Sequence, residues 1–155
     1  MGDFAFDNPQ QKERLKTSNI NKVYRDYHML LRKSAQSGLF DIMAHVDLVK
    51  KFGDRPTEDL TDEVQKTARI FKASGVVIEI NSSGLRKPVQ EIYPSTSELS
   101  IYCREGVPVT FGSDAHAPME VGFGFKDALA LAKKAGYREY VLFDKRMISR
   151  KIKII

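Results

Sequence analysis

The chain has 155 residues, of which 42% are hydrophobic and 29% charged, and it carries a formal net charge of +5. This length and composition are typical of one globular domain, residues 1–155, and no apolar run approaches the roughly 20 residues of a membrane-spanning helix. The single cysteine, Cys103, excludes an internal disulfide and a cysteine-based zinc cluster.

The predicted elements alternate between helix and strand. In chain order they are a helix at 19–37, a strand at 39–44, a helix at 58–74, a strand at 76–80, a helix at 95–105, a strand at 107–111, a helix at 119–135 and a strand at 140–143. The run Val76–Ile80 is almost entirely apolar, which favours a parallel strand covered on both faces.

The repeated strand–helix unit implies a parallel sheet with right-handed crossovers. About four parallel strands are expected, whereas a closed β/α barrel uses about eight such units in about 250 residues. The fold class is therefore α/β, either as a partial (β/α) barrel or as an open sheet.

The charge excess is concentrated in the last eleven residues, which contain Lys145, Arg146, Arg150, Lys151 and Lys153. Basic segments can bind nucleic acid or phosphorylated substrates, but no aromatic side chains alternate with these cations. We expect a solvated tail and no nucleic-acid partner. The start of the chain, Met1–Phe4, lacks the features of a signal peptide, so we expect a cytoplasmic protein without membrane contact.

Polar residues follow three of the predicted strands. His45 follows the strand at 39–44, Asn81 follows the strand at 76–80, and Asp114 and His116 follow the strand at 107–111. Since β/α barrels build active sites at the carboxyl ends of their strands, we expect these groups to converge.

Imidazole and carboxylate side chains together suit Zn²⁺, Mn²⁺ or iron. We predict His45, Asp114 and His116 as metal ligands, with Asp114 and His116 also serving catalysis; the other functional role open to His45 is that of a general base. Such a metal lowers the pKa of a bound water and polarises a phosphoryl oxygen. The alternative is structural: His45 bonds to a backbone carbonyl, Asp114 caps a helix and His116 is a loop residue.

Other polar residues lie near these strand ends. Asn81 and Ser82–Ser83 are candidates for positioning substrate or water, and Arg86 for binding phosphate as a fork. Glu79 is a carboxylate within an apolar run, which is costly unless it is paired or liganded. Asp47 either orients His45 or simply begins the next loop.

Several stretches resemble the PHP (polymerase and histidinol phosphatase) family, in its histidinol-phosphate phosphatase branch. The matching stretches lie at residues 2–7, 38–48, 79–88, 91–95 and 112–118, and the resemblance extends over nearly the whole chain. The resemblance implies a distorted seven-stranded β/α barrel that holds two or three metal ions and hydrolyses phosphomonoesters. It implies that His45, Asp114 and His116 are metal ligands and that Arg86 meets the substrate phosphate of L-histidinol phosphate, in histidine biosynthesis.

The chain also departs from that family. The family begins with a His-x-His pair and uses further histidines and a bridging glutamate in its first half, whereas this chain contains only His28, His45 and His116. We therefore expect only the carboxyl-terminal half of a PHP barrel, with an incomplete metal cluster, weaker metal affinity and exposed strand edges.

Two functional hypotheses follow. In the first, the chain is part of a metal-dependent phosphatase, completed by a complementary amino-terminal half or by a second copy. In the second, it is a catalytically silent module that oligomerises or binds a partner through its open edge. A weaker third hypothesis is the branch of the PHP family that trims nucleic acids.

Overall fold

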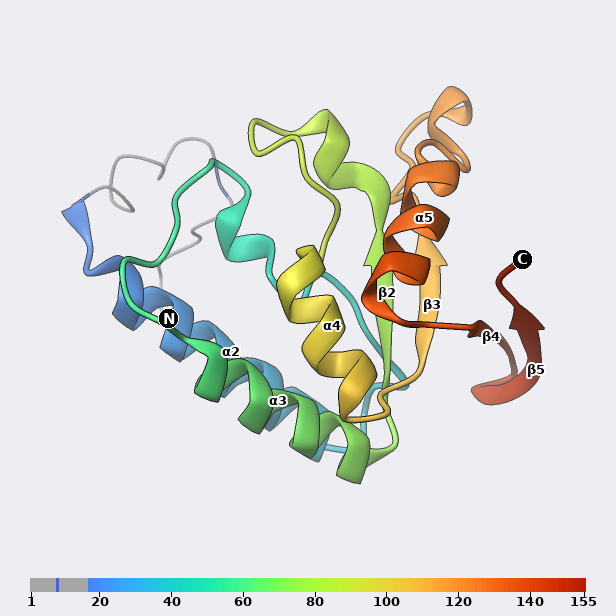
Figure 1. Ribbon diagram of the computed structural model, residues 1–155, viewed down its shortest axis with the longest axis horizontal. Coiled ribbons are helices and arrows are strands. Elements are labelled where there is room, and N and C mark those ends of the chain that lie inside the picture. The colour runs from blue at the N-terminus through green and yellow to red at the C-terminus, as the bar shows by residue number, and fades with distance from the viewer. Residues whose placement is uncertain (1–7, 9–16) are drawn as a thin grey trace.

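A computed structural model describes residue 8 and residues 17–155 of the chain (Figure 1). The expected match at residues 2–7 lies outside the described residues. The helices are α2 (Ile20–Gln36), α3 (Thr61–Ser74), α4 (Thr96–Arg104) and α5 (Phe125–Ala135). The strands are β1 (Ile42–Met43), β2 (Val77–Asn81), β3 (Val109–Gly112), β4 (Glu139–Asp144) and β5 (Met147–Lys153). Three short 3₁₀ helices are η2 (Leu48–Lys50), η3 (Ser82–Arg86) and η4 (Pro118–Glu120).

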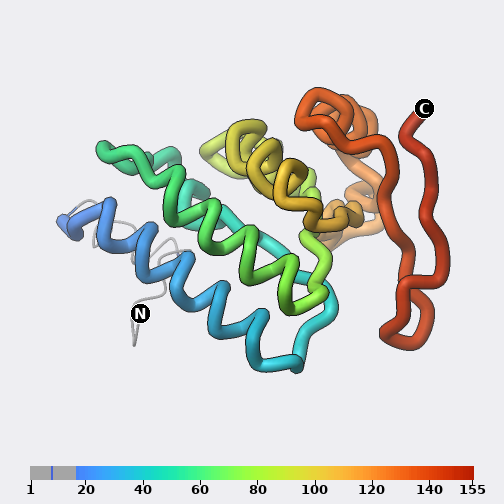
Figure 2. The backbone as a smooth tube through the Cα atoms, turned by 60° about the horizontal axis from the view of Figure 1, so that its bottom comes forward, coloured from blue at the N-terminus to red at the C-terminus, as the bar shows by residue number. Residues whose placement is uncertain are grey.

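The centre of the fold is a parallel sheet with the strand order β1-β2-β3. Its register pairs Ile42 with Val77, and Asn81 with Gly112. The four α-helices lie side by side in chain order, as Figure 2 shows. This part of the structure confirms an α/β fold with alternating helices and parallel strands.

The main core lies between the sheet and the helices. Ile78, Ile80 and Val109 are fully buried there, and the ring of Phe71 stacks on that of Tyr102 with centroids 5.7 Å apart. Since side chains alternate along a strand, Glu79 and Asn81 face away from this core. The sheet therefore turns polar side chains toward the face that the helices leave uncovered.

The predicted fourth parallel strand is wrong. Residues 139–144 form β4, which pairs antiparallel with β5 in a separate two-stranded ribbon. Lys145 and Arg146, between the two strands, both have positive φ, of 47° and 67°. Two such residues match the twist of a two-residue hairpin, so the chain turns back on itself instead of joining β3.

Two further expectations need correction. The basic end of the chain is exposed to solvent, as expected, but it forms strand β5 instead of an irregular tail, and cations on an exposed edge strand disfavour pairing with other molecules. The helix predicted from residue 119 begins only at Phe125, because Gly122 and Gly124 take left-handed conformations before it. Among the described residues, no helix is long and apolar enough to span a bilayer.

His28 lies on the buried face of α2, with only 1% of its surface exposed. Its Nδ1 is 3.2 Å from the hydroxyl of Thr67, which itself donates to the carbonyl oxygen of Glu63. Burial, together with the positive charge of Arg32, lowers the pKa of His28 to about 4. The folded protein therefore holds this imidazole in its neutral form.

We expect this histidine to make stability depend on pH. Its pKa falls from 6.5 in the unfolded chain to about 4 in the folded protein, so between these values the unfolded chain binds the extra proton. Neutral His28 contributes about 3 kcal/mol to the free energy of unfolding. This contribution is fully present above pH 6.5 and is lost as the pH falls toward 4. Urea unfolding at several pH values would measure it: His28→Gln should flatten the profile, whereas Lys22→Gln at an exposed site should not. Equal slopes for His28→Gln and the wild type would contradict the prediction.

Candidate functional site

The three parallel strands end at the same edge of the sheet, and each delivers a predicted site residue there. His45 lies two residues beyond β1, Asn81 is the last residue of β2, and Asp114 lies two residues beyond β3. The alignment follows from the register, in which Asn81 is opposite Gly112. Parallel pairing therefore brings together groups that are far apart in the sequence.

Three of the predicted residues are in contact. His45 Nε2 is 3.5 Å from Asp114 Oδ2 and 3.2 Å from Asn81 Nδ2. The same amide nitrogen of Asn81 donates to Glu79 Oε2 at 2.8 Å, while its Oδ1 accepts the N–H of Ser83. A hydrogen bond from Asn81 Nδ2 requires a lone pair on His45 Nε2, whereas one to Asp114 Oδ2 requires a proton on the same atom, so only one of the two contacts is a hydrogen bond in either tautomer. The polar contacts run from Glu79 through Asn81 and His45 to Asp114.

The backbone of the two contacting residues is strained. His45 and Asp114 have φ of 54° and 49°, in the left-handed region that non-glycine residues rarely adopt. The hydroxyl of Tyr27 donates to the carbonyl oxygen of His45. Such strain is typical of functional sites, where the surrounding structure holds a side chain in an unusual direction.

His116 lies beside this group without joining it. Its Nδ1 is 2.9 Å from the carbonyl oxygen of Asp114, and its backbone N–H donates to Glu120 Oε2 at 2.9 Å. That hydrogen bond is the main cause of the lowered pKa of Glu120. Among the described residues, no group of three or more His, Cys, Asp or Glu side chains is placed to hold a metal ion. The structure thus brings together two of the three predicted ligands.

Arg86 extends from η3 beneath the loop that carries Asp114. Its Nη2 lies 2.9 Å from the carbonyl oxygen of Ser113, 3.2 Å from that of Asp114 and 3.3 Å from Glu120 Oε2. The guanidinium also lies 5.1 Å from the ring centroid of Phe123. Its Nη1 is buried and makes no hydrogen bond within the described part of the chain. One of the two guanidinium nitrogens that were predicted to bind phosphate is therefore already hydrogen-bonded within the protein.

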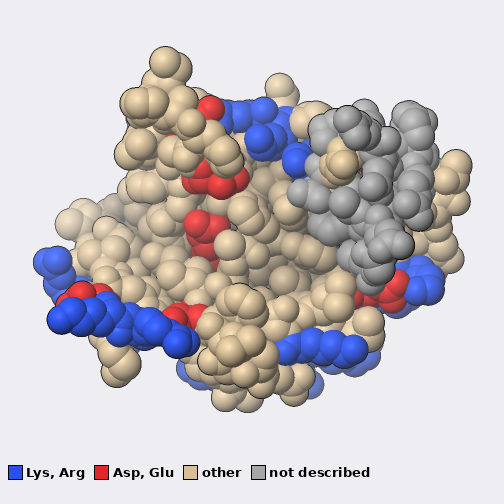
Figure 3. All heavy atoms as spheres, turned by 180° about the vertical axis from the view of Figure 1, so that it is seen from behind, with Lys and Arg blue, Asp and Glu red and all other residues tan. Residues whose placement is uncertain are grey.

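Glu79 belongs to the site, although the sequence indicated only an unusual carboxylate in an apolar strand. A Cβ at Gly112 would lie 1.8 Å from Glu79 Oε1, so the absence of a side chain there makes room for this carboxylate. Figure 3 shows the face opposite to that of Figure 1, with acidic side chains near its middle and basic ones toward its margins. Glu120, which sequence reasoning missed, carries no motif that would have identified it.

A buried ionic cluster lies beneath the site. Asp47 Oδ2 accepts from Lys50 Nζ at 2.6 Å and from the N–H of Ser95 at 2.8 Å. Lys50 Nζ also donates to the carbonyl oxygen of Ile92 and lies 3.2 Å from Glu91 Oε2. Asp47 is therefore bonded within this cluster, and it ties the segment after β1 to the segment before α4.

The separation of His45 Nε2 and Asp114 Oδ2 can be compared with metal geometry. Zinc bonds of about 2.0–2.2 Å at tetrahedral angles place two ligands about 3.3–3.5 Å apart. The observed separation is 3.5 Å, so these two donors fit one such ion. Two donors do not complete a site, because zinc in catalytic sites takes about three protein ligands.

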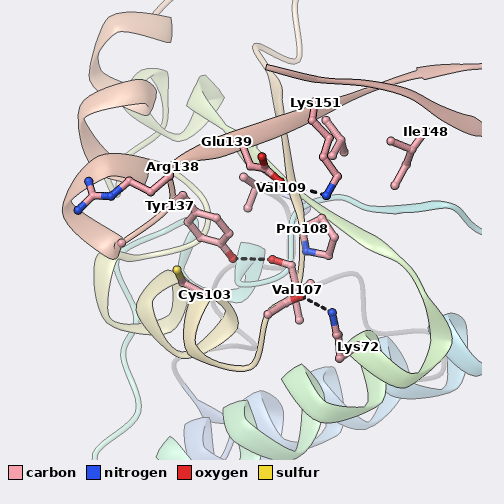
Figure 4. A pocket seen from close by; sticks show the side chains of 13 residues that line it. Lys72, Cys103, Val107, Pro108, Val109, Tyr137, Arg138, Glu139, Ile148 and Lys151 are labelled. Carbon is pink, nitrogen blue, oxygen red and sulfur yellow. Dashed lines mark hydrogen bonds and ion pairs between the residues drawn. The ribbon is translucent and has the colours of Figure 1, made fainter. Parts of the chain in front are cut away.

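A separate cavity of about 340 Å³ lies at the opposite end of the strands (Figure 4). Val107, Pro108 and Val141 line it, and the Tyr137 hydroxyl donates to the carbonyl oxygen of Val107. None of the polar residues at the carboxyl ends of the strands lines this cavity. It is distinct from the candidate site.

The known proteins that are similar to this chain carry the same name. Residues of this chain align with the "Probable histidinol-phosphatase" of Deinococcus radiodurans at 35% identity over 147 residues, covering 95% of this chain and 56% of that protein. A protein of the same name from Clostridium acetobutylicum is 30% identical over 70% of this chain and 44% of its own length. The "Histidinol-phosphatase" of Bacillus subtilis is 26% identical, with the same coverage. No protein-family model matches the chain.

A solved structure is also similar. The crystal structure of hisK from Listeria monocytogenes, named as a candidate histidinol phosphatase, superposes with a TM-score of 0.57 and 26% identity. The match covers 65% of this chain and 42% of that one. The chain thus spans about half the length of the curated relatives it matches.

We expect Lys50→Ala to destabilise the fold severely. The lysine is 1% exposed, and its removal would leave the equally buried Asp47 carboxylate without its cation. Breaking a buried pair in this way costs about 3–5 kcal/mol. Chemical denaturation would measure the change, with Lys22→Ala as the control, because its exposed pair with Asp26 should contribute less than about 1 kcal/mol. Equal small losses in both variants would show that the buried cluster adds little.

Proposed function

We propose that this chain, similar over 95% of its length to a protein named as a histidinol-phosphatase, contributes to a metal-dependent phosphomonoesterase of the PHP family. The substrate class is a small phosphate ester such as L-histidinol phosphate. The observation that carries the proposal is the contact of His45 with Asp114 and Asn81 where three parallel strands end. The names of the relatives supply the reaction, and the geometry supplies the residues.

The described residues take distinct roles in this proposal. His45 Nε2 and Asp114 Oδ2 would hold a divalent cation (zinc, manganese or iron), and because Nε2 has one lone pair, the cation would replace the Asn81 N–H at that atom. When bound, the cation supplies Lewis-acid activation of water and of the phosphoryl oxygen. His116 uses Nδ1 to contact the Asp114 carbonyl, so its Nε2 is the atom that can bind the cation or hold a proton for the leaving oxygen.

Arg86 is the residue we propose for the substrate phosphate. Its Nη2 already bonds to the loop, but Nη1 has no partner within the described part of the chain. Because Nη1 is buried, the side chain must shift before this nitrogen can donate to a substrate phosphate. Asn81 lines the same edge of the sheet and is proposed to position substrate.

We propose that ligands outside the described residues complete the metal site. Two donors fit one ion, and the curated relatives are nearly twice as long as the segment they share with this chain. The other ligands would come from a complementary segment of the barrel or from a second copy. In either case the sheet described here forms one part of a (β/α) barrel, in a cytoplasmic enzyme.

A catalytically silent module is the second candidate function. It is favoured by the exposed apolar side chains near β1, where Leu39, Phe40 and Ile42 are 72%, 50% and 38% exposed. Within the described sheet, β1 pairs only with β2, so its outer edge is open to another chain. This hypothesis expects neither metal nor turnover.

Metal binding separates the two candidates. Titration calorimetry with Zn²⁺ or Mn²⁺, in the presence of a complementary amino-terminal half of a relative, should show binding that is weakened by at least about 10–100-fold when this chain carries His45→Ala or Asp114→Asn. His28→Gln is the matched control, because His28 is buried in the helical layer and is not a proposed ligand. Phosphate release from L-histidinol phosphate, with a complementary amino-terminal half of a relative supplied, would test turnover. Absence of binding, with His116→Ala indistinguishable from the wild type, would favour the silent module.

A further inference from the structure

We propose that Glu120 is a positioning residue for the loop that carries Asp114 and His116. Neither the motifs nor the names of the relatives assign it a role. Any effect of Glu120 on catalysis rests on the proposed function, but its effect on the conformation of the loop does not. The inference is carried by hydrogen bonds that connect η4 to the end of β3.

The carboxylate of Glu120 joins two groups that would otherwise be independent. Oε2 accepts the backbone N–H of His116 at 2.9 Å and lies 3.3 Å from Nη2 of Arg86. Charged acceptors make stronger hydrogen bonds to amide donors than neutral acceptors do. Glu120 therefore fixes the backbone of His116 directly.

Arg86 extends this contact to the rest of the loop. The same Nη2 that approaches Glu120 donates to the carbonyl oxygens of Ser113 and Asp114. Glu120 and Arg86 thus hold Ser113, Asp114 and His116 of the loop. Asp114 needs such support, because residues with its left-handed φ of 49° persist only where neighbouring groups hold them.

The segment that carries Glu120 is itself anchored. Ser113 Oγ accepts the N–H of Gly122 at 3.2 Å, and the Ser82 hydroxyl donates to the carbonyl oxygen of Phe123. Gly124 fits closely against η3, where a Cβ would lie 2.9 Å from Leu85 Cδ1. Glu120 is therefore presented from a fixed segment and can hold the loop in place.

The consequence for chemistry concerns the direction of His116. Its Nδ1 contacts the carbonyl oxygen of Asp114, a contact that requires both residues to keep their backbone positions. With the N–H of His116 held by Glu120, Nε2 points away from the loop in one direction. Removal of a group that orients a metal-binding histidine typically weakens metal affinity by about 10–100-fold.

Nuclear magnetic resonance of the isolated chain tests the positioning role without metal or substrate. In Glu120→Ala, we expect the His116 amide proton to lose its downfield shift, and the ring nitrogens of His116 to move toward a mixture of tautomers. Glu120→Gln keeps an oxygen acceptor and should retain part of both signals. Glu105→Ala is the control, because Glu105 pairs with Arg69 at 3.6 Å and is not part of this network. Unchanged His116 signals in a folded Glu120→Ala would overturn the proposal.

Zinc titration then connects the loop to the proposed function. With a complementary amino-terminal half of a relative present, we expect Glu120→Ala to raise the Zn²⁺ dissociation constant by about ten-fold, Glu120→Gln by less, and Glu105→Ala not at all. If the wild type binds no zinc under these conditions but the His116 signals still depend on Glu120, the positioning role stands and the phosphatase proposal fails. If zinc binds equally well to the wild type and Glu120→Ala, Glu120 does not position this site.

Discussion

The pairing of β2 with both neighbours, parallel and in one register, is the constraint on which the rest of the structure depends. It places Asn81 opposite Gly112 and lets the segments after β1 and β3 meet above the end of β2. A shift of one residue would turn Glu79 and Asn81 into the apolar layer and turn Ile78 and Ile80 outward. The burial of Ile78 and Ile80 against the helices therefore also determines where the polar chemistry lies.

The edge of the sheet is polar, and the fold compensates for this with buried partners. Lys50 bonds to Asp47 and to the Ile92 carbonyl, which ties the segments following β1 and β2 to each other beneath the candidate site. Arg86 and Glu120 do the same for the loop after β3. Each strand end is thus held by ionic groups from another segment, and strained residues such as His45 and Asp114 can persist.

Several features that lack a complete set of partners lie on the side of the sheet that the helices leave uncovered. Within the described part of the chain, two donors that fit one ion, an acidic carboxylate packed against Gly112 and an open outer edge of β1 all lie on the side of the sheet away from the helices or at its margin. The curated relatives extend well beyond the shared segment, and the proposed function assigns the covering of this surface to further structure. The phosphatase and the silent module differ only in whether that structure brings ligands.

The alternation of helices and strands, the parallel pairing of the first three strands and the polar character of their carboxyl ends could be predicted from the sequence. These follow from local periodicity and from apolar runs such as Val76–Ile80, which do not depend on distant contacts. Tertiary structure decided the rest. The chain turns back at Lys145 and Arg146 because of their backbone conformation, so β4 joins β5 and not β3. Asp47 is three residues from Lys50, and His116 is four from Glu120, but the contacts of Asp47 with Ser95 and of Glu120 with Arg86 join segments that no sequence spacing brings together.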